Sequence, residues 1–149
     1  MQAKMSNELQ RAKELLDNNP FTCVLVGKDT VYSSAQRGVK PLLRWLDEGL
    51  CLKQFSAADK VVGKAAAYLY VLLGIRSLYA KVISEQALGV LEDHKIEVSY
   101  GTKVEVIRNR TNTGLCPMEQ CVIGINTPRE ALGAIRKKLF ELTQMNSPN

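Results

Sequence analysis

Apolar positions recur at helical spacing in three segments of the chain. Ser6–Asn18 carries its apolar residues on one face, with Ser6 as a candidate cap and DNNP at its end. Gly38–Gly49 repeats this pattern and stops at a glycine, and Thr127–Leu142 opens with Thr-Pro. The spacing predicts an amphipathic helix in each of the three segments.

Two short runs near the N-terminus instead favour strands. TCVLV (22–26) and TVYSS (30–34) are rich in β-branched residues, and Gly27-Lys28-Asp29 lies between them. A short loop that contains glycine is typical of a hairpin. We therefore expect two antiparallel strands here.

The middle of the chain alternates between buried helix and strand patterns. Ala58–Leu73 is apolar on nearly every side, which predicts a buried helix. RSLYAKVIS (76–84) predicts a strand, SEQALGVLEDHK (84–95) a helix capped by Ser84, and IEVSYG (96–101) another strand. Strand, helix and strand at this spacing predict a right-handed parallel crossover.

The elements together predict an α/β fold. Lys103–Arg108 is a further candidate extended piece, followed by the turn-rich NRTNTG. The chain has 149 residues and shows no repeat or linker, so residues 1–149 are expected to form one domain. The predicted architecture has three layers, with helices on both faces of a mixed sheet.

Composition excludes several classes of protein. With 46% hydrophobic and 23% charged residues the chain is neither disordered nor a coiled coil, and no run is long enough to cross a membrane. Four irregularly spaced cysteines and a charged N-terminus predict reduced thiols and a cytoplasmic location. The net charge of +5 suits a phosphate-bearing partner, but the basic clusters contain no aromatic residues, so nucleic-acid binding is not expected.

The predicted order of elements resembles the cytidine deaminase-like fold. Zinc deaminases place H-x-E or C-x-E at the start of the buried helix and P-C-x-x-C at the start of the next. Here those positions resemble Val62-Gly63-Lys64 and Ser84-Glu85-Gln86-Ala87-Leu88. Neither segment keeps the zinc ligands, and Lys64 stands where the deaminase glutamate would be.

Nearly the whole chain is also similar to a bacterial family described only as a domain of unknown function. The similarity is carried by ADKVVGKAAA (58–67) and TGLCPME (113–119). That family resembles the deaminases in fold and lacks their metal site. The resemblance implies a homo-oligomer, and it says almost nothing about a reaction, because fold does not imply function.

The sequence supplies few ligands for a metal. A zinc site needs three or four Cys, His or carboxylate ligands, and the only histidine, His94, lies in the polar run EDHK. Cys116 and Cys121 are five residues apart, about 140° around a helix, so they do not face one ion or form a redox pair. We expect no metal and no cofactor, and zinc-dependent deamination is not expected.

Cys116 is the strongest candidate for a functional side chain. Pro117 suits a first helical position and Glu119 stands where a capping carboxylate reaches back, which makes Cys116 the cap. A thiol at a helix start has a lowered pKa. The resemblance to the deaminases implies that Lys64, at the position of their glutamate, lies in the wall of the same cleft as Cys116. Its side chain is expected either to extend to solvent or to lie in a pocket with a lowered pKa.

The remaining polar and sulfur-containing residues have simpler interpretations. Asp59 is predicted to lie at a helix start, as a cap or a first-turn acid, and Glu85 in a first turn. His94 is expected to be exposed near a helix end. Packing roles are predicted for Cys23, Cys51, Cys121, Tyr68, Tyr70 and Tyr79.

Three hypotheses for function follow. In the first, the domain binds a small anionic ligand, such as a nucleotide or a carboxylate, in a cleft at the helix N-termini. That cleft would be lined by Lys64, Ser84, Glu85, Cys116 and Glu119. In the second, Cys116 is the nucleophile of a metal-independent enzyme, and Lys64 or Glu119 transfers protons. In the third, the protein binds a partner and its cleft is vestigial.

Overall fold

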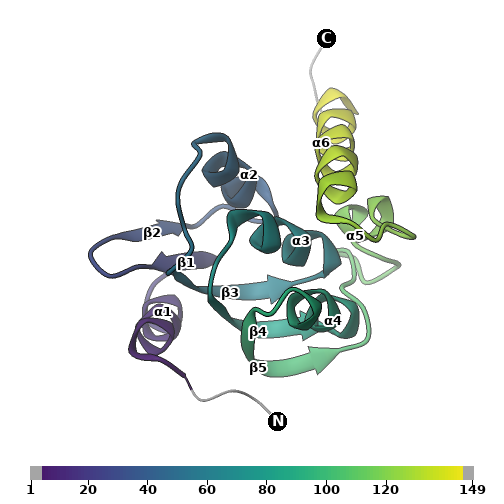
Figure 1. Ribbon diagram of the computed structural model, residues 1–149. Coiled ribbons are helices and arrows are strands. Elements are labelled where there is room, and N and C mark those ends of the chain that lie inside the picture. The colour runs from purple at the N-terminus through teal and green to yellow at the C-terminus, as the bar shows by residue number, and fades with distance from the viewer. Residues whose placement is uncertain (1–4, 146–149) are drawn as a thin grey trace.

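The computed structural model describes residues 5–145, which form a five-stranded sheet with helices on both faces (Figure 1). The strands are β1 (Cys23–Val26), β2 (Val31–Ser34), β3 (Ser56–Val62), β4 (Ser77–Ser84) and β5 (Glu97–Val104). The helices are α1 (Asn7–Asn18), α2 (Lys40–Asp47), α3 (Lys64–Leu73), α4 (Glu85–Asp93), α5 (Pro117–Cys121) and α6 (Pro128–Met145). No helix in this part of the chain is long and apolar enough to cross a membrane.

The sheet is mixed, as predicted. Its strand order is β2-β1-β3-β4-β5. β1 pairs antiparallel with β2 and β3, whereas β3, β4 and β5 run parallel. The predicted hairpin is confirmed as β1 and β2, and the predicted parallel crossover as β4, α4 and β5. The α/β class is therefore confirmed.

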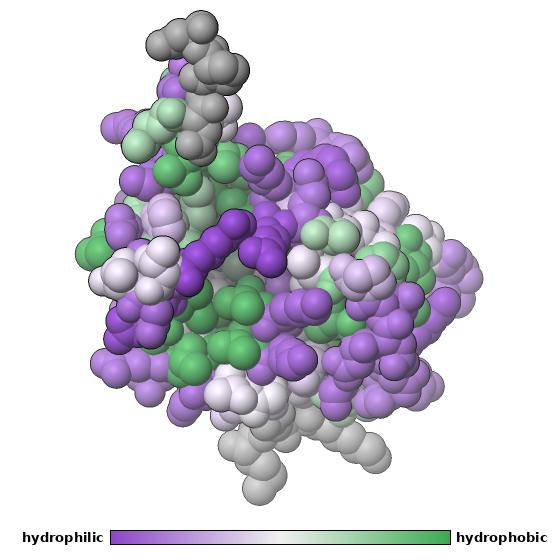
Figure 2. Space-filling view, turned by 180° about the vertical axis from the view of Figure 1, so that it is seen from behind, coloured by the Kyte–Doolittle hydropathy of each residue, from purple (hydrophilic) through white to green (hydrophobic). Residues whose placement is uncertain are grey.

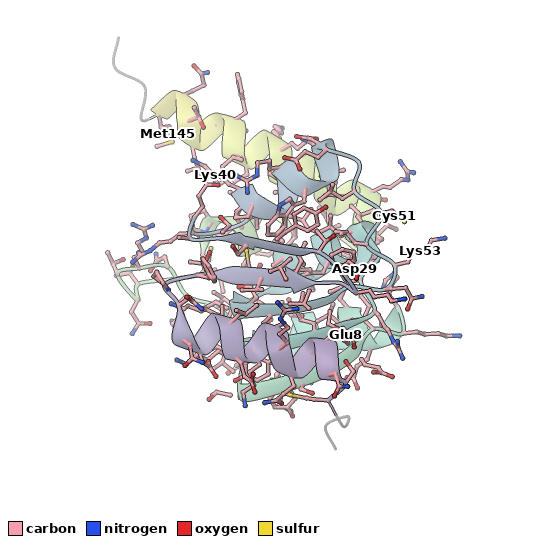
Figure 3. All side chains as sticks on the ribbon, turned by 90° about the vertical axis from the view of Figure 1, so that its left-hand side faces the viewer. Glu8, Asp29, Lys40, Cys51, Lys53 and Met145 are labelled. Atoms are coloured by element: carbon pink, nitrogen blue, oxygen red, sulfur yellow. The ribbon has the colours of Figure 1, made fainter. Side chains whose placement is uncertain are left out.

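The two faces of the sheet have separate cores. On one face, α1 packs Leu9, Ala12 and Leu16 against the strands. The other face carries α2, α3 and α4, and α3 is apolar almost all round because it lies between the sheet and other helices. Figure 3 shows this division, with Glu8 of α1 on one side of the sheet and Lys40 of α2 on the other.

The helix predicted for Ala58–Leu73 is too long at its start. Residues 56–62 form β3, and α3 begins at Lys64. The alanines of this segment favour a helix, but pairing with β1 on one side and β4 on the other decides for a strand. Asp59 consequently lies in the middle of a strand, and its predicted place at a helix start is wrong. The segment also creates a second parallel crossover, β3-α3-β4.

The alternation of side chains shifts in the parallel strands. In a regular strand every second side chain lies on the same face. Asp59 of β3 lies on the face that packs against α3, where it accepts a hydrogen bond from Tyr70, but the next core residue on that face is Val62, three positions later. Ala80 and Ile83 of β4 show the same step. Residues 60, 81 and 101 lie in the row where the strand pairing is interrupted. As a result, Val61 and Val82 turn toward the α1 side of the sheet.

Gly101 is required at this irregular row. A Cβ on Gly101 would lie 2.9 Å from the Lys81 carbonyl oxygen, which belongs to the backbone of the neighbouring strand. We expect Gly101→Ala to lower the free energy of unfolding by about 1–3 kcal/mol. Gly89→Ala is the matched control: Gly89 lies inside α4 with open space around it, so alanine there should add about 0.5–1 kcal/mol. Urea unfolding of both variants tests this, and equal stabilities would contradict it.

Candidate functional site

The amino end of α3 is held by a carboxylate from a distant segment. The backbone N–H of Lys64 donates to Glu119 Oε1 at 2.7 Å, and the N–H of Ala65 donates to Oε2 at 3.0 Å. Both donors belong to the first turn of α3, where amides have no partner within the helix and the helix dipole favours a negative charge. A side chain on Gly63 would overlap the Glu119 carboxylate, so glycine allows this close approach.

This contact corrects the prediction for Glu119. The sequence predicts that its carboxylate reaches back to the start of its own helix, but the carboxylate accepts from two amides of α3 instead. Cys116 is the N-cap of α5 and Pro117 its first residue, as predicted, yet the Cys116 thiol makes no capping hydrogen bond. The thiol-bearing side chain is half-buried and packs against the main core.

The backbone around Cys116 fastens the loop that follows β5. The Cys116 N–H donates to the Ile107 carbonyl at 3.1 Å, and Arg108 forms an antiparallel bridge with Leu115. The Gln120 side chain donates to the Leu115 carbonyl at 3.0 Å. The extended piece predicted for Lys103–Arg108 overlaps β5 only at residues 103 and 104, because β5 ends at Val104. The rest of it is an irregular segment tied to the start of α5.

The other predicted site residues lie at the starts of α3 and α4, which follow the adjacent parallel strands β3 and β4. Ser84 is buried and accepts from the Ala87 N–H at 3.1 Å, which confirms it as the cap of α4. Glu85 is exposed in the first turn of that helix. Lys64 is partly exposed, with its ammonium 6.0 Å from the centre of the Tyr68 ring. The binding role of these residues stays a prediction.

The other three cysteines and the histidine differ in how far they are buried. Burial raises the pKa of Cys23 far above its usual range and also raises that of Cys121, whose thiol donates to the Met118 carbonyl. Cys51 is exposed, so its predicted packing role is wrong: it lies in the loop after α2, and its neighbour Leu52 is buried instead. His94 is exposed at the end of α4, as predicted.

The three tyrosines pack as predicted: Tyr68, Tyr70 and Tyr79 are all buried. Metal ligands are not gathered in residues 5–145, where no three His, Cys, Asp or Glu side chains could hold one ion.

A hollow opens where the three parallel strands end. Its volume is about 390 Å³, and we call it the strand-end hollow. It is lined by Val61 of β3, Val82 of β4, Val104 of β5 and the loop residues Glu105, Val106, Ile107 and Arg108. Val61 is 47% exposed and Val106 is 36% exposed, so the hollow presents adjacent apolar side chains to the surface. Figure 2 shows hydrophobic residues gathered near the middle of the view from behind, bordered by hydrophilic ones.

Three cationic residues belong to the lining of this hollow or are next to a lining residue in sequence. Lys60 and Lys81 immediately precede the two strand valines and are exposed, and Arg108 forms part of the wall. None of these three cations forms an ion pair with another residue of the range 5–145. Glu105 is the one acidic residue in the lining. The hollow thus combines an aliphatic floor with the unpaired cation Arg108, and two more cations adjoin its valines in sequence. No local motif in the sequence indicated this feature.

Asp59 lies on the opposite side of β3 from the hollow. Its Oδ2 accepts from the Tyr70 hydroxyl at 2.7 Å, and its Oδ1 accepts from the Val61 N–H at 3.2 Å. Burial raises the pKa of Asp59 to about 7, outweighing the hydrogen bonds from Tyr70 and the β3 backbone that lower it. A carboxyl group that titrates near neutral pH is therefore built into the strand that forms one wall.

The profile of a family described as TM1506, domain of unknown function (DUF1893), matches residues 11–139, from within α1 to within α6. The chain belongs to the DUF1893 family. A crystal structure of a DUF1893 family protein, TM1506 from Thermotoga maritima, is similar over 94% of this chain and 93% of that one. The two share 25% sequence identity with a TM-score of 0.80. No curated protein matches the chain significantly.

The matched region of this DUF1893 protein includes the strand-end hollow, Asp59 and the contact of Glu119 with α3. Both stretches that suggested the family, 58–67 and 113–119, meet at that contact. The likeness to cytidine deaminases stays a prediction.

Replacing Glu119 should destabilise the fold through α3. Glu119→Gln keeps the shape but leaves one amide of α3 facing an NH₂ group, so we expect a loss of about 1–2 kcal/mol in the free energy of unfolding. Glu85→Gln, the same change at an exposed first-turn acid, should stay within about 0.5 kcal/mol. Urea unfolding measures both, and equal losses would show that the Glu119 contact adds nothing.

Asp59→Asn should change how stability depends on pH. The folded pKa of about 7 lies above the ordinary 3.8, so the native protein holds its proton while the unfolded chain loses it. The contribution of this carboxyl group to the free energy of unfolding is fully present below about pH 4 and is lost as the pH rises to about 7. We compare the free energy of unfolding of Asp59→Asn with that of wild type. The difference, variant minus wild type, should be about 1–3 kcal/mol larger at pH 8 than at pH 5. Thermal unfolding at both pH values checks this, and a pH-independent difference would contradict it.

Proposed function

We propose that this protein binds a small molecule with an apolar body and an acidic group in the strand-end hollow. One observation carries the proposal: a hollow of about 390 Å³, lined mostly by aliphatic side chains, lies across the carboxyl ends of β3, β4 and β5. In α/β sheets, ligands bind outside the carboxyl ends of the strands. The volume falls within the range of small-molecule sites.

The charges around the hollow support an acidic ligand. Lys60, Lys81 and Arg108 have no ion-pair partner within the described residues, and the whole chain carries a net charge of +5. An anion would pair with at least one of them at the rim while its body covered the valines. The lining contains no aromatic side chain, which favours an aliphatic or aromatic carboxylate or phosphate ester over a ligand that needs a stacked base.

The site proposed here differs from the cleft predicted at the helix N-termini. The first free amides of α3 are already bonded to Glu119, and the Ser84 hydroxyl caps α4. The chain's own side chains therefore already accept from the amides of Lys64, Ala65 and Ala87, and ligand binding at the helix N-termini stays a prediction. The nucleophile hypothesis for Cys116 and the partner-binding hypothesis stay predictions.

Fluorescence titration with 8-anilinonaphthalene-1-sulfonate tests the proposal, because this probe joins an apolar ring system to a sulfonate. Val61→Asp places a charge on the floor of the hollow and should weaken probe binding by roughly tenfold or more. Val31→Asp is the matched control, since Val31 is 38% exposed on β2 at the other end of the sheet, and it should leave the affinity within about twofold.

The preference for an acidic group in the ligand is tested separately with N-phenyl-1-naphthylamine, a probe of similar shape without the sulfonate. Arg108→Gln should weaken binding of the sulfonate probe by about three- to tenfold and leave the affinity for the neutral probe unchanged. Equal effects of Val61→Asp and Val31→Asp would refute binding in the hollow. Equal effects of Arg108→Gln on both probes would refute only the preference for an anion.

A further inference from the structure

The Asp59 carboxyl connects the buried helix α3 to the wall of the strand-end hollow. One oxygen accepts from the Tyr70 hydroxyl of α3, and the other accepts from the N–H of Val61, whose side chain lines the hollow. Val61 lies directly after the row where the strand alternation shifts. The hydrogen bond from Val61 therefore holds the backbone in the conformation that turns this valine away from α3.

The surroundings of Asp59 offer little compensation for a negative charge. Two titratable groups face it directly: Cys23, its register partner on β1, and Tyr70 of α3. Two cations lie further along, Lys60 next to it on β3 and Arg44 of α2, whose charge lowers the pKa of Cys23. On the β4 side its register partner is Ala80. No residue of the described range forms an ion pair with Asp59.

We propose that the proton on Asp59 regulates the strand-end hollow, so that an anionic ligand binds more tightly when Asp59 is protonated than when it is ionised. This inference rests on the proposed function, because it concerns the same hollow. Asp59 acts as a positioning residue for Val61 and as a nearby charge, and it does not contact the ligand.

Electrostatics determines the direction of the effect. An ionised Asp59 places a negative charge behind the wall of the hollow and repels an acidic ligand through the sheet. Since the pKa of Asp59 is raised to about 7, its charge changes across neutral pH. By linkage, a bound anion favours the protonated form in return. We expect the sulfonate probe to bind roughly three- to tenfold more weakly at about pH 8.5 than at about pH 6.

Matched variants assign the pH dependence to Asp59. The probe titration is repeated across this pH range with wild type, Asp59→Asn and His94→Gln. Asp59→Asn should abolish the pH dependence, because asparagine keeps the shape and cannot ionise. His94→Gln removes the only histidine, which lies at the end of α4, and should leave the pH dependence unchanged.

A second variant keeps the test independent of any loss of folding in the first. Tyr70→Phe removes a hydrogen bond that lowers the pKa of Asp59, so the midpoint of the binding curve should move to higher pH. The neutral probe should bind equally at both pH values. If the sulfonate probe binds in the hollow with the same affinity throughout, or if Asp59→Asn keeps the wild-type profile, the inference is wrong. Probe binding that is insensitive to Val61→Asp would instead refute the proposed function itself.

Discussion

The contact between the Glu119 carboxylate and the first two amides of α3 organises much of this structure. Hydrogen bonds to a charged group contribute about 1.5–3 kcal/mol each, and an unsatisfied helix start inside the fold would cost a similar amount. The two bonds join residues more than fifty positions apart in the chain. They fix α5 against α3, and α5 in turn holds the loop after β5 through Cys116 and Leu115. The outer wall of the strand-end hollow is part of that loop.

The same contact changes the interpretation of the two sequence stretches that suggested the family. Gly63 and Glu119 fit each other sterically, because a side chain on Gly63 would overlap the carboxylate. TGLCPME is then explained in large part by folding, since its cysteine contributes a backbone hydrogen bond and its glutamate a helix cap. Membership of the DUF1893 family therefore identifies a shared architecture more directly than a shared reaction.

Strand β3 shows where local preference and tertiary structure disagree. It contains alanines that favour a helix and a partly buried aspartate, both unusual for a strand in the interior of a sheet. Such conflicts often mark functional positions in proteins. Here they coincide with the interruption of the strand pairing that turns Val61 and Val82 toward the surface. The irregularity thus lies directly beside the floor of the hollow, and a titratable group lies on the other side of the same strand.

The sequence by itself determined the elements whose information is local. Ser6, Ser84 and the Cys116-Pro117 pair mark helix starts, Gly49 a helix end and Gly27 a hairpin turn, because caps and turns depend on a few neighbouring residues. It also determined the α/β class, through the alternation of apolar patterns. Only the tertiary structure decided that residues 56–62 are a strand, that Glu119 binds α3, and that Asp59, Val61 and Arg108 lie around one hollow. These features arise from pairing and packing between segments far apart in the chain, and local preference carries no information about such partners.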